Sequence, residues 1–378
     1  MHILIAPNAF KNSLDAAQVA LAIEEGLKQS RLDCTTECFP IADGGDGTGG
    51  LIVERCKGKT VKQSVRDPLG REIASSFGLI GDGKAAVIEM ADASGLRLLK
   101  KEQLDPMWAS SYGTGELIKA ALDKTVKRII IAMGGSATVD GGCGILSALG
   151  IKFLDDAGRE LIARPKELAK MARIDASGID DRILNCEVVI LCDVDNTLLG
   201  TQGAAAVFGP QKGATPGEVE LLDSFLANFA AISKTQTGTD MVAIKHGGVA
   251  GGATAGLYTW LNAKLVNGIE YFLELIGFDE ALKRSDLVIT GEGSIDRQTL
   301  QGKGPYGVAV KAKALNLPVV ALAGNVSAEG DEELKRYFDE LICINEEGFD
   351  IAEAIKNTRG NLIRSAISVG NSIASKII

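Results

Sequence analysis

Histidine is scarce in this chain, and its scarcity excludes several kinds of catalytic site. Only two of the 378 residues are histidine, His2 and His246. Neither lies in the context of a Ser/His/Asp hydrolase, and the nucleophile motif Gly-x-Ser-x-Gly is absent. Cys34 and Cys38 lack nearby histidines that could complete a zinc site. We therefore expect neither a serine hydrolase nor a zinc enzyme.

Regularly spaced cysteines and long apolar runs are also missing. The seven cysteines are odd in number, and several lie inside apolar runs, as is typical of buried, reduced thiols. No window reaches the roughly 18 uninterrupted apolar residues of a membrane span, and no basic, apolar leader precedes the first predicted strand. We expect a cytoplasmic protein without disulfides.

An excess of basic residues is the third absence. The formal net charge is −9, which argues against a nucleic-acid or anionic-membrane partner. Aromatic residues make up only 5%, whereas 45 residues are glycine and 46% are hydrophobic, a composition typical of α/β enzymes with many tight turns. The length favours two domains. The sequence allows a homo-oligomer but does not specify one.

Four apolar, strand-like runs end in loops that contain carboxylate residues, and three of these loops also contain glycine. They are Cys38–Gly47, Ile129–Gly142, Val188–Asn196 and Leu287–Asp296. Glycine lets backbone N–H groups approach an anion, and carboxylates hold a divalent cation or accept a proton. Phosphate with Mg²⁺ is the simplest ligand that needs both, so we expect an active site at the carboxyl ends of strands.

The order of elements predicts an α/β fold with two domains. A strand at His2–Ala6 and a helix at Asn12–Gly26, with a Ser or Asn N-cap, form a βα unit. Parallel βαβ alternation returns from Asp286 onward. We therefore expect a discontinuous Rossmann-like α/β/α domain at 1–63 and 286–378, with a second α/β domain at 64–285 inserted into it.

Phosphoryl transfer fits these loops, although two other classes remain open. A Walker A motif is missing because Gly304 follows Gly302-Lys303, so any nucleotide site must have another design. The segment Gly45–Gly50 matches G-x-G-x-x-G and leaves a nicotinamide-dependent dehydrogenase as one alternative. A ligand-binding protein without turnover is the other.

Several longer motifs, in consistent order along nearly the whole chain, resemble the bacterial glycerate kinase family. They are Ala6–Leu14, Asp43–Thr48, Asp67–Arg71, Gly134–Gly142, Cys192–Asn196, Phe208–Ala214, and Gly291–Asp296 with Gln298-Thr and Gly302-Lys. The resemblance implies ATP-dependent, Mg²⁺-assisted phosphorylation of D-glycerate, leaning toward the 2-hydroxyl and 2-phosphoglycerate. It also implies two α/β domains with the active site between them.

The chain departs from the family pattern at five of these motif positions. Asn8 and Ala9 stand where the family has Asp-Ser, Asp46 where it has Glu, Val139 where it has Asn, and Ser294 where it has Arg. The glycine-rich stretch 247–256 is altered as well. A kinase for another small hydroxy acid is therefore the nearest alternative.

The residues and the resemblance together assign candidate roles. The catalytic candidates are Asp193, Lys11 and Asp43, and Asp193, directly after an apolar strand, is the preferred general base or metal ligand. The substrate-binding candidates are Asn8, Ser13, Arg71, Glu292, Asp296 and Lys303. The nucleotide-binding candidates are Gly134, Gly135, Ser136 and Lys212, and the metal candidates are Asp46 and Asp195.

Each assignment has a structural alternative. Ser13, Asp43, Asp46 and Asp193 are also suitable helix N-caps, and the basic side chains could simply be solvated. Asp140 could contact metal or ribose, or cap the helix predicted at Gly141–Leu149.

Overall fold

The structure is a computed structural model that describes residues 1–327, 331–346 and 348–377. It is a mixed α/β fold, as predicted. The chain divides into two compact units, Met1–Asp43 with Ile269–Ile378 (unit 1) and Gly44–Gly268 (unit 2). The first boundary between the units precedes the predicted 63/64, because α2 (Thr48–Arg55) packs against strands of unit 2. The domain boundaries at 63/64 and 285/286 stay a prediction.

Unit 1 is built on a five-stranded, wholly parallel sheet in the order β13-β12-β11-β1-β2. Its strands are β1 (His2–Ile5), β2 (Thr35–Cys38), β11 (Leu287–Ile295), β12 (Val319–Val326) and β13 (Glu340–Cys343). Its helices are α1 (Ala16–Gln29), α11 (Gly268–Leu275), α12 (Phe278–Leu282), η5 (Arg297–Gln301), α13 (Gly304–Ala314), α14 (Asp331–Leu334) and α15 (Ile351–Ile377). The sequence also predicts a helix at 328–338; the structure shows the short α14 in this region, and 328–330 lie outside the described residues.

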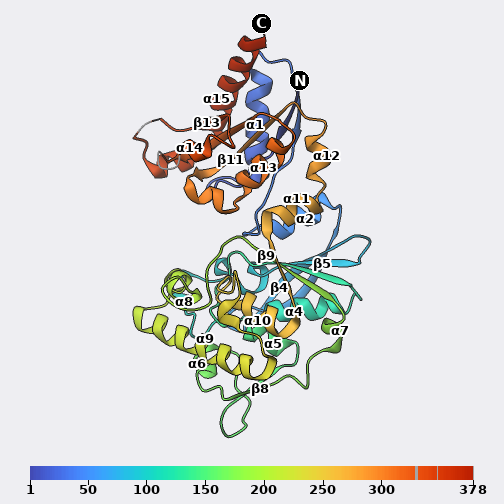
Figure 1. Cartoon of the computed structure of the whole chain (residues 1–378), viewed down its shortest axis with the longest axis vertical. Helices are drawn as coiled ribbons and strands as arrows, with labels where there is room; N and C mark the ends of the chain where they lie inside the picture. The colour runs from blue at the N-terminus through green and yellow to red at the C-terminus, as the bar shows by residue number, and fades with distance from the viewer. Residues whose placement is uncertain (328–330, 347, 378) are drawn as a thin grey trace. The chain divides into compact units, whose positions relative to one another are not determined.

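The first helix differs from its prediction at both ends. α1 begins at Ala16 because Asp15, not Ser13 or Asn12, is the N-cap and forms a capping box with Gln18. Gly26 does not end the helix. It lies where α1 and α15 pack side by side (Figure 1), and a Cβ on Gly26 would lie 2.5 Å from the carbonyl oxygen of Ile363. The glycine is thus required by close helix packing.

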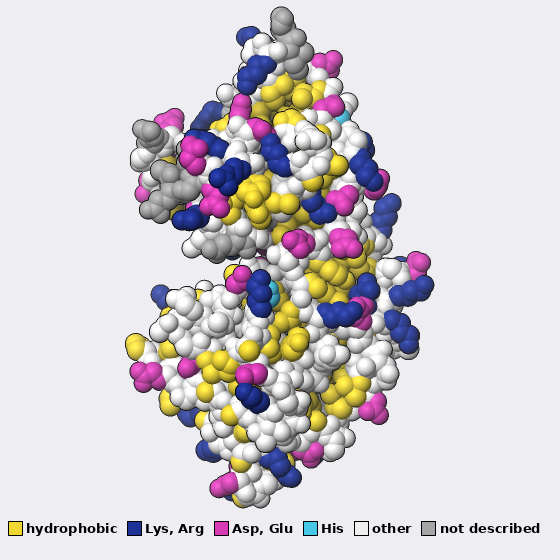
Figure 2. Space-filling view, in the orientation of Figure 1, with side chains coloured by type: hydrophobic (Ala, Val, Ile, Leu, Met, Phe, Trp, Pro, Cys, Tyr) yellow, Lys and Arg dark blue, Asp and Glu magenta, His cyan; other side chains and the backbone are white. Residues whose placement is uncertain are grey.

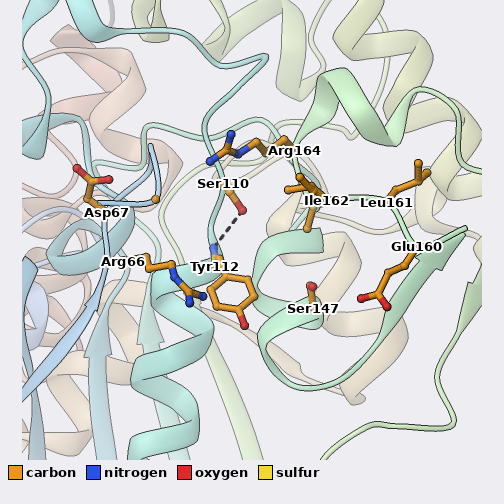
Figure 3. A pocket seen from close by; sticks show the side chains of 11 residues that line it. Arg66, Asp67, Ser110, Tyr112, Ser147, Glu160, Leu161, Ile162 and Arg164 are labelled. Atoms are coloured by element: carbon orange, nitrogen blue, oxygen red, sulfur yellow. Dashed lines mark hydrogen bonds between the residues drawn. The ribbon is translucent and has the colours of Figure 1, made fainter. Parts of the chain in front are cut away.

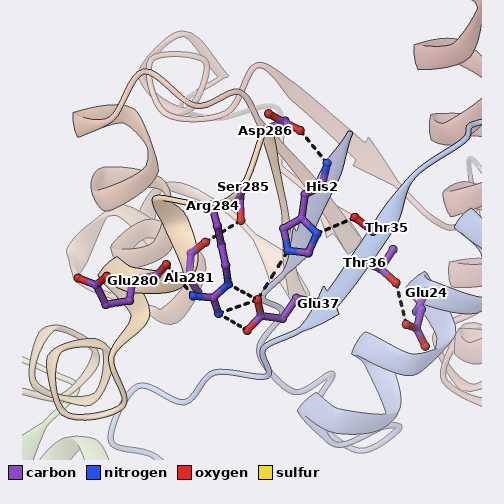
Figure 4. A network of polar contacts seen from close by, with 10 residues as sticks. All are labelled: His2, Glu24, Thr35, Thr36, Glu37, Glu280, Ala281, Arg284, Ser285 and Asp286. Carbon is purple, nitrogen blue, oxygen red and sulfur yellow. Dashed lines mark hydrogen bonds and ion pairs between the residues drawn. The ribbon is translucent and has the colours of Figure 1, made fainter.

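Polar side chains fasten the amino ends of the central strands of unit 1 (Figure 4). The backbone N–H of His2 donates to Asp286 Oδ2 over 2.7 Å, and its ring Nδ1 lies 2.8 Å from Thr35 Oγ1. Arg284 forms an ion pair of 2.7 Å with Glu37 on β2. These contacts connect the chain entering β11 to β1 and β2, so segments that are remote in sequence form one sheet.

The opposite, carboxyl edge of this sheet contains a topological switch point. β1 and β11 are neighbours, but the chain continues from β1 to β2 on one side and from β11 to β12 on the other. In open parallel α/β sheets, ligands bind outside the carboxyl ends of strands at such a point. The residues that follow β1 and those at the end of β11 are therefore placed at a binding edge.

Unit 2 contains a six-stranded sheet in the order β10-β9-β6-β5-β4-β3. Its strands are β3 (Lys59–Arg66), β4 (Glu72–Ile80), β5 (Ala85–Glu89), β6 (Arg128–Ala132), β9 (Glu187–Cys192) and β10 (Lys264–Asn267), and β7 (Lys152–Leu154) pairs with β8 (Arg173–Asp175). The four strands from β10 to β5 are parallel, whereas β4 and β3 are antiparallel to their neighbours. The carboxyl ends of β5, β6 and β9 thus share one edge.

Unit 2, which the structure describes throughout, contains nine α-helices besides its strands. They are α2, α3 (Ala91–Ser94), α4 (Tyr112–Leu122), α5 (Cys143–Ala148), α6 (Pro165–Leu168), α7 (Asp181–Leu184), α8 (Ala204–Phe208), α9 (Pro216–Thr237) and α10 (Ala253–Leu261). Short 3₁₀ turns lie at Leu96–Leu98, Lys101–Gln103, Pro210–Lys212 and Met241–Ala243. The glycine-rich stretch 247–256 packs tightly: Gly251 and Gly256 have no room for a Cβ against Thr138 and Gly141.

The surface carries charges of both signs. On the face shown in Figure 2, basic and acidic side chains are interspersed. In the part of the chain that the structure describes, no helix is both long and apolar enough to cross a membrane.

Candidate active site

In unit 1, side chains from three strand ends meet at the switch point. Asn8 follows β1 and Asp43 follows β2, and Asn8 Nδ2 donates to Asp43 Oδ2 over 2.9 Å. The same oxygen accepts a longer hydrogen bond of 3.4 Å from the backbone N–H of Gly304, at the start of α13. Asp43 is thus held at a helix N-terminus, where a carboxylate is favoured, and remains partly exposed.

Glu292 on β11 is the buried acid of this group. It is only 8% exposed, and Thr299 Oγ1 donates to its Oε1 over 2.9 Å. Burial raises the pKa of Glu292 to about 7; Lys303 opposes the shift, and the negative charges of Asp43 and Asp296 add to it. A carboxyl group with such a pKa can exchange a proton near neutral pH.

Asp296 and Lys303 flank the 3₁₀ turn η5. Asp296 caps this turn by accepting from the backbone N–H of Gln298 over 2.8 Å. Lys303 precedes α13, and its ammonium lies 4.0 Å from Asp296 Oδ1. Both side chains are about one-third exposed, so the ammonium can also reach an anionic ligand.

Lys11 and Ser13 lie in the turn between β1 and α1. Lys11 is exposed, and a Cβ added to Gly293 on β11 would meet the Lys11 backbone nitrogen at 3.7 Å. Ser13 is engaged elsewhere, because its hydroxyl donates to the carbonyl oxygen of Ile355 over 2.8 Å. The geometry therefore favours Lys11 over Ser13 as an anion ligand.

In unit 2, Gly134, Gly135 and Ser136 follow β6. Gly135 has a φ of 70°, and a Cβ on Gly134 would lie 2.5 Å from the carbonyl carbon of Gly45. Only glycine at both positions lets the loop take this path beside the Gly45-Asp46 backbone. The loop has the glycine-rich form that suits phosphate oxygens.

Lys212 supports this loop from within the protein. The side chain is 2% exposed, and its Nζ donates to Ser136 Oγ over 3.0 Å and to the carbonyl oxygen of Thr138 over 2.7 Å. Burial lowers the pKa of Lys212 to about 7, and Asp140 opposes the shift. The sequence predicts direct nucleotide binding by Lys212, whereas the geometry shows a lysine that fixes the loop.

Asp140 is a structural cap. It is fully buried and accepts from the hydroxyl and the backbone N–H of Ser111, both over 2.7 Å, and from the N–H groups of Gly142 and Gly144. These bonds fasten the start of α5 to the start of α4. Of the two roles considered for Asp140, the structure shows the cap.

Asp193 and Asp195 follow β9, where the chain has left strand geometry. Asp193 is partly buried. Asp195 Oδ1 lies 2.8 Å from His246 Nδ1 and 3.6 Å from the ammonium of Lys245. In a regular strand, Asp193 and Asp195 would point to the same face and Val194 to the other. Because these residues lie in a loop, strand alternation does not fix their directions.

Glu89 at the end of β5 is a site candidate that sequence reasoning missed. It is 7% exposed and accepts a hydrogen bond from the backbone N–H of Gly47, the N-cap of α2. Burial raises its pKa to about 7, and Asp92 and Asp46 add to the shift. The sequence does place this carboxylate at the end of an apolar run, but no glycine follows it, so the glycine-loop pattern does not include it.

Arg97 was missed as well, and it lies among these acids. It forms ion pairs with Asp92 and, over 2.9 Å, with Asp46. Nothing in its local sequence, Gly95-Leu-Arg97-Leu, indicates this position. The contact shows that the predicted metal ligand Asp46 already has a cationic partner.

The Gly45–Gly50 motif does not form a dinucleotide fingerprint. It opens α2, but Glu89 occupies the N–H of Gly47 at the helix N-terminus where a pyrophosphate would bind. This arrangement opposes the dehydrogenase alternative.

Arg71 is engaged within its own turn. Its Nε and one terminal nitrogen each lie 2.5 Å from Asp67 Oδ2, and Asp67 is 1% exposed. The pair stabilises the turn between β3 and β4. The geometry therefore does not support the predicted substrate role of Arg71.

Among the residues that the structure describes, no group of three or more His, Cys, Asp and Glu side chains could hold a metal by itself. Mg²⁺ does not need such a cage, since it commonly binds one or two carboxylates together with phosphate oxygens and water. Asp46 and Asp195 are both exposed, and each already has a cationic or imidazole partner at Oδ1, so their role as metal ligands stays a prediction.

Comparison with known proteins identifies the family. The glycerate kinase family model matches residues 3–374. The chain is 42% identical to the glycerate kinase of Bacillus subtilis, covering 99% of this chain and 98% of the relative, and 39% identical to the glycerate 2-kinase of Escherichia coli with the same coverages. A Salmonella typhimurium LT2 crystal structure, assigned as glycerate kinase 2, superimposes with a TM-score of 0.85 at 42% identity, covering 100% of this chain and 99% of that one. The chain belongs to the glycerate kinase family.

Proposed function

We propose that the protein transfers the γ-phosphoryl group of ATP directly to the 2-hydroxyl of D-glycerate and releases ADP and 2-phosphoglycerate. The observation that carries this proposal is the group Asn8, Asp43, Glu292 and Lys303 at the switch point of unit 1. It combines hydrogen-bonding groups for a hydroxyl with a cation for a carboxylate. A small hydroxy acid needs both. The name of the E. coli relative supports the choice of the 2-hydroxyl.

The substrate carboxylate is assigned to the cations of unit 1. Lys303 is the nearer to the acids, and Lys11 adds a second, exposed ammonium. Asp43 and Asn8 then orient the acceptor hydroxyl, because their mutual hydrogen bond fixes both side chains. Glu292 and Asp296 line the same edge. We assign no substrate contact to Ser13 or Arg71.

The nucleotide phosphates are assigned to the loop Gly134–Ser136 of unit 2. Gly135 is exposed, and Lys212 holds Ser136 in place through a 3.0 Å hydrogen bond. When bound, Mg²⁺ would be held by Asp46 and Asp195 and would neutralise charge on the phosphates. The remaining role, acceptance of the hydroxyl proton, falls to Asp193.

Replacement of Asp193 by Asn tests this assignment. The variant keeps the shape of the side chain but cannot accept a proton, so D-glycerate-dependent ADP release should fall by at least about a hundredfold. Binding of ATP, followed by calorimetry, should remain. Unchanged turnover would contradict the role of Asp193, and absence of turnover in the wild type with every hydroxy acid would contradict the kinase itself.

One observation favours a second candidate function, the phosphorylation of another small hydroxy acid. Asn8 and Ser294 depart from the family pattern, and Asn8 lies directly in the proposed acceptor group. A panel of hydroxy acids, compared by kcat/KM, separates the two. D-glycerate should give the highest value.

A further inference from the structure

A cavity in unit 2 is lined by residues to which no role has been assigned. Its volume is about 490 Å³, within the range of small-molecule sites. It lies between the turn after β3, the start of α4, α5 and the segment 160–164 (Figure 3). None of the proposed catalytic, nucleotide or metal ligands lines it. The cavity is therefore separate from the machinery described above.

Most of the charges around the cavity are compensated. Arg66 lies 3.4 Å from Glu116, and Glu160 lies 3.5 Å from Lys152. Asp67, on the turn after β3, is paired with Arg71 outside the cavity. These groups supply no net charge for a ligand.

Arg164 is the exception. Among the described residues it has no carboxylate within ion-pair distance; one terminal nitrogen donates to the carbonyl oxygen of Leu69 over 3.2 Å, and its guanidinium carbon lies 5.5 Å from the centre of the Trp108 ring. A guanidinium has five N–H donors, so most of them remain for a ligand. Its fork geometry matches a carboxylate.

The rest of the lining is half polar and half apolar. The Ser110 hydroxyl and the Tyr112 ring with its hydroxyl lie on one side, and Arg66 stacks over that ring at 4.8 Å. Leu161, Ile162 and Ala163 contribute an apolar wall. A bare inorganic ion would leave this wall uncovered, whereas a short carbon chain would bury it.

We propose that this cavity binds a small organic monocarboxylate. Arg164 holds the carboxylate, and the wall at 161–163 covers the carbon chain. Because Arg164 is the one uncompensated cation among the described residues of the lining, the ligand should carry one negative charge. Because the wall at 161–163 is apolar, the ligand should also have a short carbon chain. The site needs no contribution from the reaction proposed above.

Trp108 provides a direct readout. The chain has two tryptophans, so Trp260→Phe leaves Trp108 as the single reporter beside Arg164. Fluorescence of this full-length variant is titrated with butyrate, with the isosteric but neutral butyramide, and with inorganic phosphate. We expect a saturable change with butyrate and a much weaker response to the other two.

Substitutions then locate the site. Arg164→Gln should weaken butyrate binding at least about tenfold, whereas Arg159→Gln, an exposed arginine of a nearby turn that does not line the cavity, should not. Ile162→Asp serves if Arg164→Gln does not fold, because Ile162 is 65% exposed and a carboxylate there should repel the ligand. Three results would overturn the proposal: absence of a saturable change, equal binding of butyramide or phosphate, or butyrate binding that survives Arg164→Gln or Ile162→Asp.

Discussion

Asn8 Nδ2 donates to Asp43 Oδ2 over 2.9 Å, and this bond joins the residues that follow two neighbouring parallel strands. The neutral amide orients the carboxylate and leaves its negative charge in place. A carboxylate at position 8 would instead repel Asp43. The chain therefore has one charge at this point, where the family pattern would place two.

Loss of this bond should reduce turnover. Asn8→Ala removes the donor, and hydrogen bonds to charged groups contribute about 1.5–3 kcal/mol. We expect kcat/KM for D-glycerate to fall at least about tenfold, which corresponds to about 1.4 kcal/mol. Steady-state kinetics measure the effect, with Asn185→Ala at the exposed end of α7 as the control. Equal kcat/KM values in Asn8→Ala and the wild type would show that the bond does not position the acceptor.

Glu292 should make the free energy of unfolding depend on pH. Its pKa is about 7 in the folded protein and 4.5 in the reference state, so the folded state binds the extra proton between these values. Stability from this group is present below the lower pKa and is lost as pH rises toward about 7, at no more than about 1.4 kcal/mol per pH unit. Urea unfolding at about pH 5 and about pH 8 measures the loss.

Glu292→Gln should remove this part of the pH dependence. The variant should therefore gain stability relative to the wild type at the higher pH and lose its turnover of D-glycerate. Glu353→Gln, on the exposed first turn of α15, is the matched control. An unchanged pH dependence in Glu292→Gln would contradict the raised pKa.

Lys212 should make the free energy of unfolding depend on pH with the opposite sign. Burial lowers its pKa from 10.5 to about 7, so the unfolded chain binds the extra proton between these values and stability increases as pH rises through that window. Lys212→Met removes the buried cation, and its stability relative to the wild type should be most favourable below about pH 7. KM for ATP should rise, because Ser136 loses its donor. Exposed Lys100→Met should change neither quantity, and a constant stability difference across pH would contradict the account.

Asp46 connects the metal proposal to a measurable ion requirement. Asp46→Asn removes a proposed Mg²⁺ ligand and weakens the pairing with Arg97. The Mg²⁺ concentration for half-maximal activity should rise by about tenfold, whereas Asp156→Asn, in an exposed turn, should leave it unchanged. Titration of activity with MgCl₂ at constant ATP gives both values. An unaltered requirement in Asp46→Asn would remove Asp46 from the metal ligands.

Much of the architecture could be predicted because buried parallel strands are short apolar runs and their loops contain glycine. The loop after β6 follows this pattern, and the fold class is confirmed. The predicted glycine loop at Gly291–Asp296 is instead largely strand, because pairing with β12 extends β11 through Ile295. The N-terminus of α1 was placed too early because Ser13 and Asp15 are both suitable caps, and only the capping box with Gln18 distinguishes them.

The candidate site was less predictable, since partners come from distant positions. No local pattern shows that Lys212 is buried beneath Ser136, or that Ser13 bonds to Ile355. Glu89 and Arg97 lie outside any glycine loop, and only the fold brings them to Gly47 and Asp46. Carboxylates at strand ends can be read from sequence, whereas the side chains that neutralise or orient them require the tertiary structure.

The most direct test is the product of the wild-type enzyme with Mg-ATP and D-glycerate, identified by phosphorus NMR. The proposed function predicts D-glycerate-dependent formation of ADP together with a single new monoester signal, that of 2-phosphoglycerate. A signal of 3-phosphoglycerate would move the attack to the other hydroxyl. No phosphoglycerate, with turnover of a different hydroxy acid or of none, would contradict the account.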